Sequence, residues 1–237
     1  QELLDFVLDN YKTNNTLGYS NARDTMYGVI DLKEDNKLTC VYSGFTITLT
    51  EGLDPSTDSD EQGVNCEHSW PQSMGAQDEP QKSDLHHLFP VRANVNSSRS
   101  NNPYLEINDE NTDKWYRNDY WIETIPEDSI IHEFSEKNNT EGDGIESFEP
   151  REDHKGNAAR AMMYFYAMYK EAANDDFWNI QKDVFFQWNI YDPVDEKEYS
   201  RTIKIEEYQG YPNPFIIDTT LAQRIWLVSS GCTDSEA

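Results

Sequence analysis

The chain has 237 residues and a mean hydropathy of −0.85, and its length suits one globular domain, residues 1–237. No apolar run approaches the roughly 18 residues of a membrane helix, so no membrane partner is expected. Acidic side chains outnumber basic ones by 45 to 19, and the net charge of −26 disfavours any partner that needs a broad basic surface, as nucleic acid ordinarily does.

The first third of the chain predicts one helix and two strands. Residues 2–11 place apolar side chains near helical spacing and predict an amphipathic helix. Residues 37–50 alternate and are rich in β-branched and aromatic side chains, so they predict two strands that meet at Ser43-Gly44. Residues 51–63 are expected to form a polar loop. Its acids are candidate calcium ligands, although their spacing does not fit the EF-hand pattern: Asp54, Asp58, Asp60 and Glu61.

The rest of the chain predicts more helix than strand. Residues 113–125 predict another strand, and residues 136–146 predict a flexible loop. The strongest helix signal lies in residues 155–173, where aromatic and apolar side chains recur at helical spacing. Further helices are predicted over residues 176–188, 196–207 and 219–227. Because the strands are inserted between helices and do not alternate with them, the sequence predicts an α+β fold.

A thiol, a carboxylate and an imidazole stand side by side at Cys66, Glu67 and His68, just before Trp70-Pro71. A carboxylate and an imidazole can hold a metal ion and move a proton. Successive strand residues face opposite ways, so Glu67 and His68 share one site only if the strand bends or ends there. Trp70-Pro71 is consistent with such an ending.

Partners for this pair are expected further along the chain. Proline is welcome in the first turn of a helix, so a short helix is predicted to begin at Pro90. Arg92, Asn96 and Arg99 are spaced by four and three residues and share one helical face, whereas Asn94 points to nearly the opposite side. That face offers a neutral oxygen ligand flanked by two guanidinium groups, which suits a hard metal ion and a phosphate.

These residues together predict a one-metal centre for phosphodiester cleavage. Glu67 supplies a charged oxygen and Asn96 a neutral oxygen to Mg²⁺, and His68, with an ordinary pKa of about 6.5, takes a proton from the attacking water. Two stretches are mildly basic: residues 81–104 hold three bases against one acid, and residues 150–170 hold four against two. The candidate substrate contacts are Lys82, Arg92 and Arg160. The residues expected to brace the centre through hydrogen bonds are Asp84 and His86.

The motifs around these residues resemble those of the bacterial endonuclease I family. The resemblance begins in CEHSWPQSMG (66–75) and SDLHHLFPVRANVNSSRSN (83–101). It continues in SFEPREDHKGNAARAMMYFYAMY (147–169), QGYPNPFI (209–216) and LAQRIW (221–226), so it covers nearly the whole chain. It implies a secreted or periplasmic nuclease with a ββα-metal, or His-Me finger, core within about 36–104 and a helical C-terminal part at about 150–230.

By the same resemblance, His68 is the general base, Glu67 and Asn96 hold Mg²⁺, with Mn²⁺ as a substitute, and Arg99 is a structural or phosphate-facing member of the catalytic set. The implied reaction is hydrolysis of DNA, without sequence preference, to 5′-phosphate and 3′-hydroxyl ends. The sequence does not reveal the oligomeric state, and a monomer is the default expectation. Whether RNA is also cut is left open. The chain departs from the family at Lys82, the only base where members carry an arginine, and in YPNPF (211–215), which lacks a base.

Two other functions fit parts of the sequence. A zinc hydrolase or structural zinc module would use Cys66, His68, His86 and His87, but no His-Glu-x-x-His pattern is present. An acidic calcium-dependent binding module would use residues 54–61 and would leave the Glu-His pair unexplained. The cysteines permit one disulfide or three free thiols, and their spacing does not choose between them: Cys40, Cys66 and Cys232.

The acidity predicts an unusual response to salt. Few phosphate contacts are expected from such small basic stretches, and repulsion between the protein and nucleic acid is screened beyond about 8 Å at 0.15 M salt. Activity is therefore expected to fall less steeply with NaCl than the activity of a basic nuclease.

Overall fold

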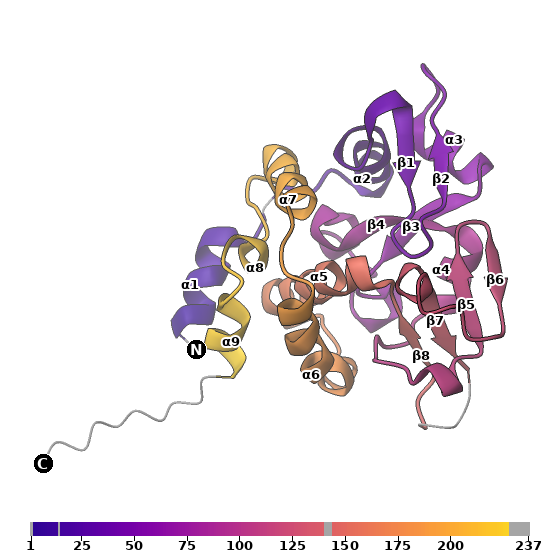
Figure 1. The fold of residues 1–237 in the computed structure, drawn as a ribbon. Helices are drawn as coiled ribbons and strands as arrows, with labels where there is room; N and C mark the ends of the chain where they lie inside the picture. The colour runs from indigo at the N-terminus through magenta and orange to yellow at the C-terminus, as the bar shows by residue number, and fades with distance from the viewer. Residues whose placement is uncertain (1, 14, 140–143, 228–237) are drawn as a thin grey trace, which may run out of the picture.

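A two-stranded hairpin followed at once by a short helix lies at the centre of the fold (Figure 1). The computed structural model describes residues 2–13, 15–139 and 144–227. Strand β3 (Val64–His68) pairs antiparallel with β4 (Leu88–Arg92), so that Glu67 lies opposite Phe89. Helix α4 (Ala93–Arg99) begins directly after β4. This strand–strand–helix order is the one that the motifs imply for residues 36–104.

Pro90 does not begin the helix, as the sequence predicts. It lies within β4, opposite Cys66, and its carbonyl oxygen accepts a hydrogen bond from the Val41 amide at 3.0 Å. The fixed φ of proline suits an extended strand where no N–H is needed, as well as the first turn of a helix. The helix therefore starts at Ala93, and Asn96 and Arg99 still lie within one turn of each other on it.

The strands of the described residues form three small antiparallel sheets, and the predicted α+β class is confirmed. One pairs β1 (Lys37–Thr39) with β2 (Thr46–Thr48), as predicted for residues 37–50. The largest has the order β6-β5-β7-β8. Its strands are β5 (Lys114–Arg117), β6 (Tyr120–Ile122), β7 (Ser135–Asn138) and β8 (Ser147–Glu149).

In two segments of this sheet the structure differs from the prediction. Residues 113–125 hold two strands, because the chain turns at Asn118, whose φ of 50° is tolerated by asparagine. Residues 136–138 belong to β7, so the predicted loop is wrong there, and residues 140–143 lie outside the described part of the chain.

The predicted helices are confirmed to within a few residues. Helices α5 (Lys155–Met168) and α6 (Asp175–Tyr191) pack against each other in the middle of the molecule (Figure 1). The others are α1 (Glu2–Tyr11), α2 (Tyr19–Thr25, continued by a π-helical turn over Met26–Ile30), α3 (Pro55–Glu61), α7 (Glu196–Gln209), α8 (Pro214–Ile217) and α9 (Leu221–Trp226). Short 3₁₀ segments lie at Glu34–Asn36, Gln72–Met74, Gln81–Ser83, Leu85–His87, Asp109–Asn111, Ile131–Glu133 and Glu152–His154.

Helix α3 replaces the polar loop predicted for residues 51–63. Asp54 caps it by accepting a hydrogen bond from the Thr57 amide at 2.8 Å, and Pro55 occupies its first turn. Asp58 is buried and accepts the Thr50 amide, while Asp60 pairs with Arg23. The helix has no apolar stripe, so hydrophobic periodicity gives no signal for it. Three of the acids considered as calcium ligands therefore have protein partners.

Trp70 fixes the end of β3 in the core. Its side chain is fully buried, stacks on Phe165 of α5 with 4.8 Å between ring centroids, and donates its indole N–H to the Met74 carbonyl at 2.8 Å. The aromatic face predicted for α5 is buried as expected. The strand ends at His68, two residues before Trp70, because the Trp70 side chain packs against α5 and the chain must leave the sheet.

The structure answers part of the question whether the cysteines form a disulfide. Cys40 and Cys66 are both buried free thiols, whereas Cys232 lies outside the described residues. Burial raises the pKa of the Cys40 thiol to about 12.

None of the helices in the described ranges combines the length and apolar character needed to cross a bilayer. The assignment of residues 1–237 to one domain stays a prediction.

Arg160 is an internal residue of the helical part and has no exposed surface. Its guanidinium makes two hydrogen bonds with the Glu198 carboxylate, at 2.7 and 2.6 Å, and one with the Asp192 carbonyl at 2.9 Å. It thus ties α7 to α5. This position does not fit the predicted contact with substrate, and the helical face that carries Arg160 is buried because α5 is enclosed on nearly all sides.

Replacing Arg160 by methionine is expected to lower the free energy of unfolding strongly. The change leaves the buried Glu198 carboxylate without its partner, a situation that typically costs about 3–5 kcal/mol. Urea unfolding of the purified variant measures the loss. Arg224→Met is the matched control, since its pair with Asp218 is about half exposed, and its loss is expected to stay below about 1 kcal/mol. Equal losses in the two variants would contradict the assignment.

Candidate active site

Glu67 is the buried acid at the end of β3, with 2% of its surface exposed. Its Oε1 accepts a hydrogen bond from the Tyr42 hydroxyl at 2.9 Å and lies 2.9 Å from Nη1 of Arg99. The Tyr42 hydroxyl also makes a short hydrogen bond with the Tyr104 hydroxyl. Burial raises the pKa of Glu67, and Arg99 and Tyr42 oppose that rise only in part. The carboxylate is therefore buried and held by one cation and one hydroxyl.

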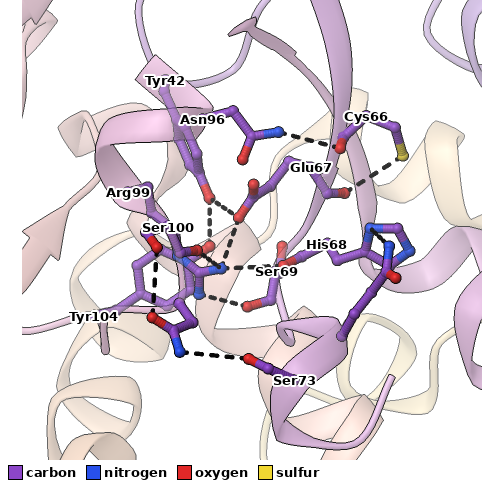
Figure 2. A network of polar contacts seen from close by, with 12 residues as sticks. Tyr42, Cys66, Glu67, His68, Ser69, Ser73, Asn96, Arg99, Ser100 and Tyr104 are labelled. Carbon is purple, nitrogen blue, oxygen red and sulfur yellow. Dashed lines mark hydrogen bonds and ion pairs between the residues drawn. The ribbon is translucent and has the colours of Figure 1, made fainter. Parts of the chain in front are cut away.

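Asn96 presents an amide oxygen to the same place. Its Nδ2 donates to Oδ1 of Asn65 at 2.8 Å and to the Cys66 carbonyl at 3.2 Å, which fixes the direction of the amide group. Figure 2 shows the Asn96 amide oxygen and the Glu67 carboxylate turned toward one another. Among the described residues no hydrogen bond goes to Oε2 of Glu67. A charged and a neutral oxygen are thus available together, a donor set that fits Mg²⁺ with water completing its coordination.

Arg99 organises the end of the strand. It is 1% exposed, and besides Glu67 it donates to the His68 carbonyl at 3.1 Å and to the Ser69 carbonyl at 2.7 Å. Its guanidinium lies 4.5 Å from the centre of the Tyr104 ring. These contacts hold the Glu67 carboxylate and the backbone carbonyls of His68 and of the residue after it. Arg99 is therefore buried behind the site and holds it in position, and it does not face the solvent.

His68 lies on the other side of the chain from the Glu67 carboxylate (Figure 2). Its Nε2 is 3.0 Å from the Lys82 carbonyl oxygen, which accepts only, so Nε2 carries the proton and Nδ1 has the free lone pair. The Gln72 amide nitrogen is 3.5 Å from that Nδ1. Burial lowers the pKa of His68 to about 3, so the imidazole is neutral at ordinary pH. The Glu67 and His68 side chains thus leave β3 on opposite faces, as the alternation of side chains along a strand predicts.

Of the two candidate substrate cations, Lys82 lies near His68, whereas Arg92 is paired with Val64 at the other end of β3. The Lys82 ammonium is 5.2 Å from the centre of the Tyr19 ring, and that ring is 5.5 Å from the His68 ring. Arg92 precedes α4, and its guanidinium is 4.7 Å from the Phe45 ring centre. One of its terminal nitrogens is buried and has no hydrogen-bond partner among the described residues.

Asp84 and His86 brace the segment that holds His68. Asp84 accepts hydrogen bonds from the hydroxyls of Tyr164 and Tyr169, at 2.9 and 2.6 Å. Nε2 of His86 bonds with the Tyr211 carbonyl at 2.9 Å. These contacts anchor residues 84–86 to α5 and to the C-terminal part. They thereby hold the nearby Lys82 carbonyl in place for His68.

Among the described residues, one group of three or more His, Cys, Asp or Glu side chains is close enough together to hold a metal ion, and it is acidic: Glu106, Glu149 and Glu152. The ammonium of Lys155 lies within 2.9 Å of one carboxylate oxygen of each. One internal cation therefore already occupies the position between the three carboxylates and offsets part of their charge. The four residues of the zinc alternative do not form such a cluster, and His87 instead bonds with the Gln81 carbonyl at 2.6 Å.

Tyr42 and Tyr104 are site residues that the sequence does not reveal. They lie 25 and 37 residues from Glu67 along the chain, and neither belongs to a motif with a chemical signature. Alternation in residues 37–50 predicts a buried side for this strand pair, but not that one buried hydroxyl would meet a carboxylate. Only the folded chain brings the three together.

Arg99→Lys is expected to destabilise the protein although it keeps the charge. One ammonium cannot reproduce the fork that reaches Glu67 and two carbonyls at once. Hydrogen bonds from charged groups contribute about 1.5–3 kcal/mol each, so a loss of about 2–4 kcal/mol is expected in urea unfolding with EDTA present. Arg23→Lys, at a partly exposed pair, is the control and is expected to change little. Indistinguishable unfolding midpoints for the two variants would refute this role of Arg99.

Comparison with known proteins agrees with the motifs. The profile of the family described as Endonuclease I matches residues 3–220. The extracellular ribonuclease of Bacillus subtilis (strain 168) is 29% identical over 180 residues, which cover 68% of this chain and 54% of that protein. The extracellular ribonuclease of Bacillus amyloliquefaciens is 30% identical over 178 residues, 68% of this chain and 53% of that protein. The chain spans about half the length of these curated relatives. It belongs to the endonuclease I family.

Proposed function

We propose that this chain is a metal-dependent nuclease that hydrolyses phosphodiester bonds without sequence preference. The observation that supports this best is the pair of oxygens offered by Glu67 and Asn96 at the end of the strand that also carries His68, whose Nε2–H is held by the Lys82 carbonyl. Mg²⁺ bound by the two oxygens would neutralise charge on the phosphate and on the leaving oxygen.

His68 is the proposed base, which requires that water and substrate entering the site relieve part of the burial that lowers its pKa, because a general base works best with a pKa near the working pH. Because its Nε2–H donates to the Lys82 carbonyl, the proton from the attacking water goes to Nδ1. The Gln72 amide near Nδ1 must give way to that water, and its long contact of 3.5 Å makes this a small change. The resulting imidazolium keeps its hydrogen bond to the Lys82 carbonyl, which stabilises the new charge.

The proposed substrates are both RNA and DNA. The curated relatives are named extracellular ribonucleases, whereas the motifs led to DNA as the expected substrate. Contacts to phosphates, not to bases, explain indifference to sequence, and Lys82 and Arg92 are the proposed phosphate contacts. We also propose that the protein acts outside the cell, as those relatives' names indicate for them, and as a monomer.

Chelation followed by metal rescue is the first test of the proposed function. EDTA is expected to abolish cleavage of supercoiled plasmid and of single-stranded RNA, and Mg²⁺ or Mn²⁺ is expected to restore it. His68→Ala is expected to reduce kcat by about 10²–10⁴-fold, the range typical of a lost general base. Asn96→Ala is expected to weaken Mg²⁺ activation, whereas Asn94→Ala, on the exposed side of α4, serves as its matched control.

Restoration by Zn²⁺ alone would favour the zinc hydrolase instead. Equal cleavage by His68→Ala and wild type would exclude His68 as the base. End-labelling of the products, expected to give 5′-phosphate and 3′-hydroxyl ends, provides a separate check.

The salt response tests how the acidic chain holds its substrate. A nuclease with 6–10 phosphate contacts loses about 10³–10⁵ in affinity between 50 and 200 mM salt. Here we expect KM to rise by less than about tenfold over that range, because few cations are available for phosphates. Initial rates against NaCl concentration measure this, and a steep loss from the lowest salt upward would show that phosphate contacts dominate.

A further inference from the structure

Trp121 is an aromatic side chain left unusually open to solvent. All six tryptophans lie within the described ranges, and only Trp121 is exposed, at 44%. It belongs to β6, which lies at one edge of the largest sheet. The ammonium of Lys114, on the neighbouring strand, lies 4.7 Å from the centre of its ring. An exposed indole beside a cation is a surface suited to a flat, negatively charged partner.

The strand register places this ring on the side of the sheet that meets α4. Tyr116 is paired with Trp121, and Lys114 with Lys137, so these side chains share one face of the sheet. The Tyr116 hydroxyl donates to Oγ of Ser98 at 2.8 Å, which joins that face to α4. Figure 1 shows β5 beside α4.

A second contact links the hairpin to the candidate active site. The Asn118 amide, in the turn between β5 and β6, donates to the Ser43 carbonyl. The adjacent Tyr42 hydroxyl binds the Glu67 carboxylate. The hairpin is thus attached on one side to the helix that carries Asn96 and on the other to the loop that holds Glu67.

We propose that Trp121, with Lys114 beside it, is a base-stacking subsite for single-stranded nucleic acid whose scissile phosphate lies at Glu67 and Asn96. This inference rests on the proposed nuclease function and adds the means by which the substrate is held. A strand leaving the metal site runs along α4 to Ser98, which the Tyr116 hydroxyl contacts, and reaches the indole on the same face of the sheet. Lys114 then lies close enough to the stacked nucleotide to meet its phosphate.

The charge of the protein favours this mode of binding. A chain with a net charge of −26 gains little from long-range attraction to phosphates. Stacking of bases on aromatic rings needs no net charge, and it accepts every base because each has a π-face. Duplex DNA keeps its bases stacked inside, so the subsite should favour single strands. The stacking part of the binding is therefore weakened less by salt than the contact between Lys114 and a phosphate.

Binding of a fluorescein-labelled single-stranded 12-mer, RNA or DNA, measured by anisotropy in EDTA, tests the subsite. Loss of one base–aromatic stack raises Kd by about 5- to 150-fold, and we expect about tenfold for Trp121→Ala. Trp121→Phe should retain most of the affinity. Tyr191→Ala is the matched control, because that ring is 81% exposed on α6 outside the candidate site, and its Kd should equal the wild-type value.

Two further readouts separate stacking from a structural role. An oligonucleotide of abasic sugar-phosphate should bind wild type and Trp121→Ala equally, whereas a merely misfolded variant would bind it more weakly than wild type. With Mg²⁺, Trp121→Ala should raise KM for single strands and leave kcat within about twofold.

The possible results divide cleanly. An unchanged Kd in Trp121→Ala, or no measurable binding of the 12-mer by wild type, overturns the subsite. Absence of cleavage by wild type with any divalent ion overturns the proposed function instead. A wild type that cleaves single strands, with a Trp121→Ala variant that differs only in Kd and KM, supports both.

Discussion

The buried pair of Glu67 and Arg99 is the interaction on which the site depends. Both side chains are almost completely enclosed, so each would be costly without the other. Arg99 does more than balance the charge of Glu67, because the same guanidinium donates hydrogen bonds to the His68 and Ser69 carbonyls. One side chain of α4 thereby sets the position of the carboxylate and of the backbone that carries the candidate base. Tyr42 completes the arrangement, since its hydroxyl binds the same carboxylate oxygen.

The remaining polar contacts extend this support outward. Lys82 holds His68 through its carbonyl group, and Asp84 holds that segment through two tyrosine hydroxyls of the central part, Tyr164 and Tyr169. Helix α5 therefore serves the site indirectly: its aromatic side chains both fill the core and anchor a loop. The same helix carries Arg160, which is buried against Glu198 of α7. A basic residue near the motifs is therefore not always free to contact a phosphate. In so acidic a chain, several of the cations are already committed to internal pairs.

The sequence predicts the parts of this site that local periodicity controls. Four- and three-residue spacing put Arg92, Asn96 and Arg99 on one face, and the structure keeps Asn96 and Arg99 together even though the helix begins later than Pro90. What the sequence could not predict depends on contacts between distant segments. Proline suits a strand as well as a helix start, polar α3 has no apolar stripe, and the burial of Arg160 depends on α7. Tyr42 meets Glu67 only in the folded chain.

The opposite directions of Glu67 and His68 constrain any mechanism that uses both. A carboxylate on one face of β3 and an imidazole on the other cannot act on a phosphate that lies flat against either face. They can act together only on a phosphate that lies across the end of the strand, where Ser69 leads into Trp70. The ending of β3 is therefore as important as the residues within it. Arg99 fixes the two carbonyls at that end, and Trp70 fixes the exit by stacking on α5, so the core and the site are held by the same few contacts.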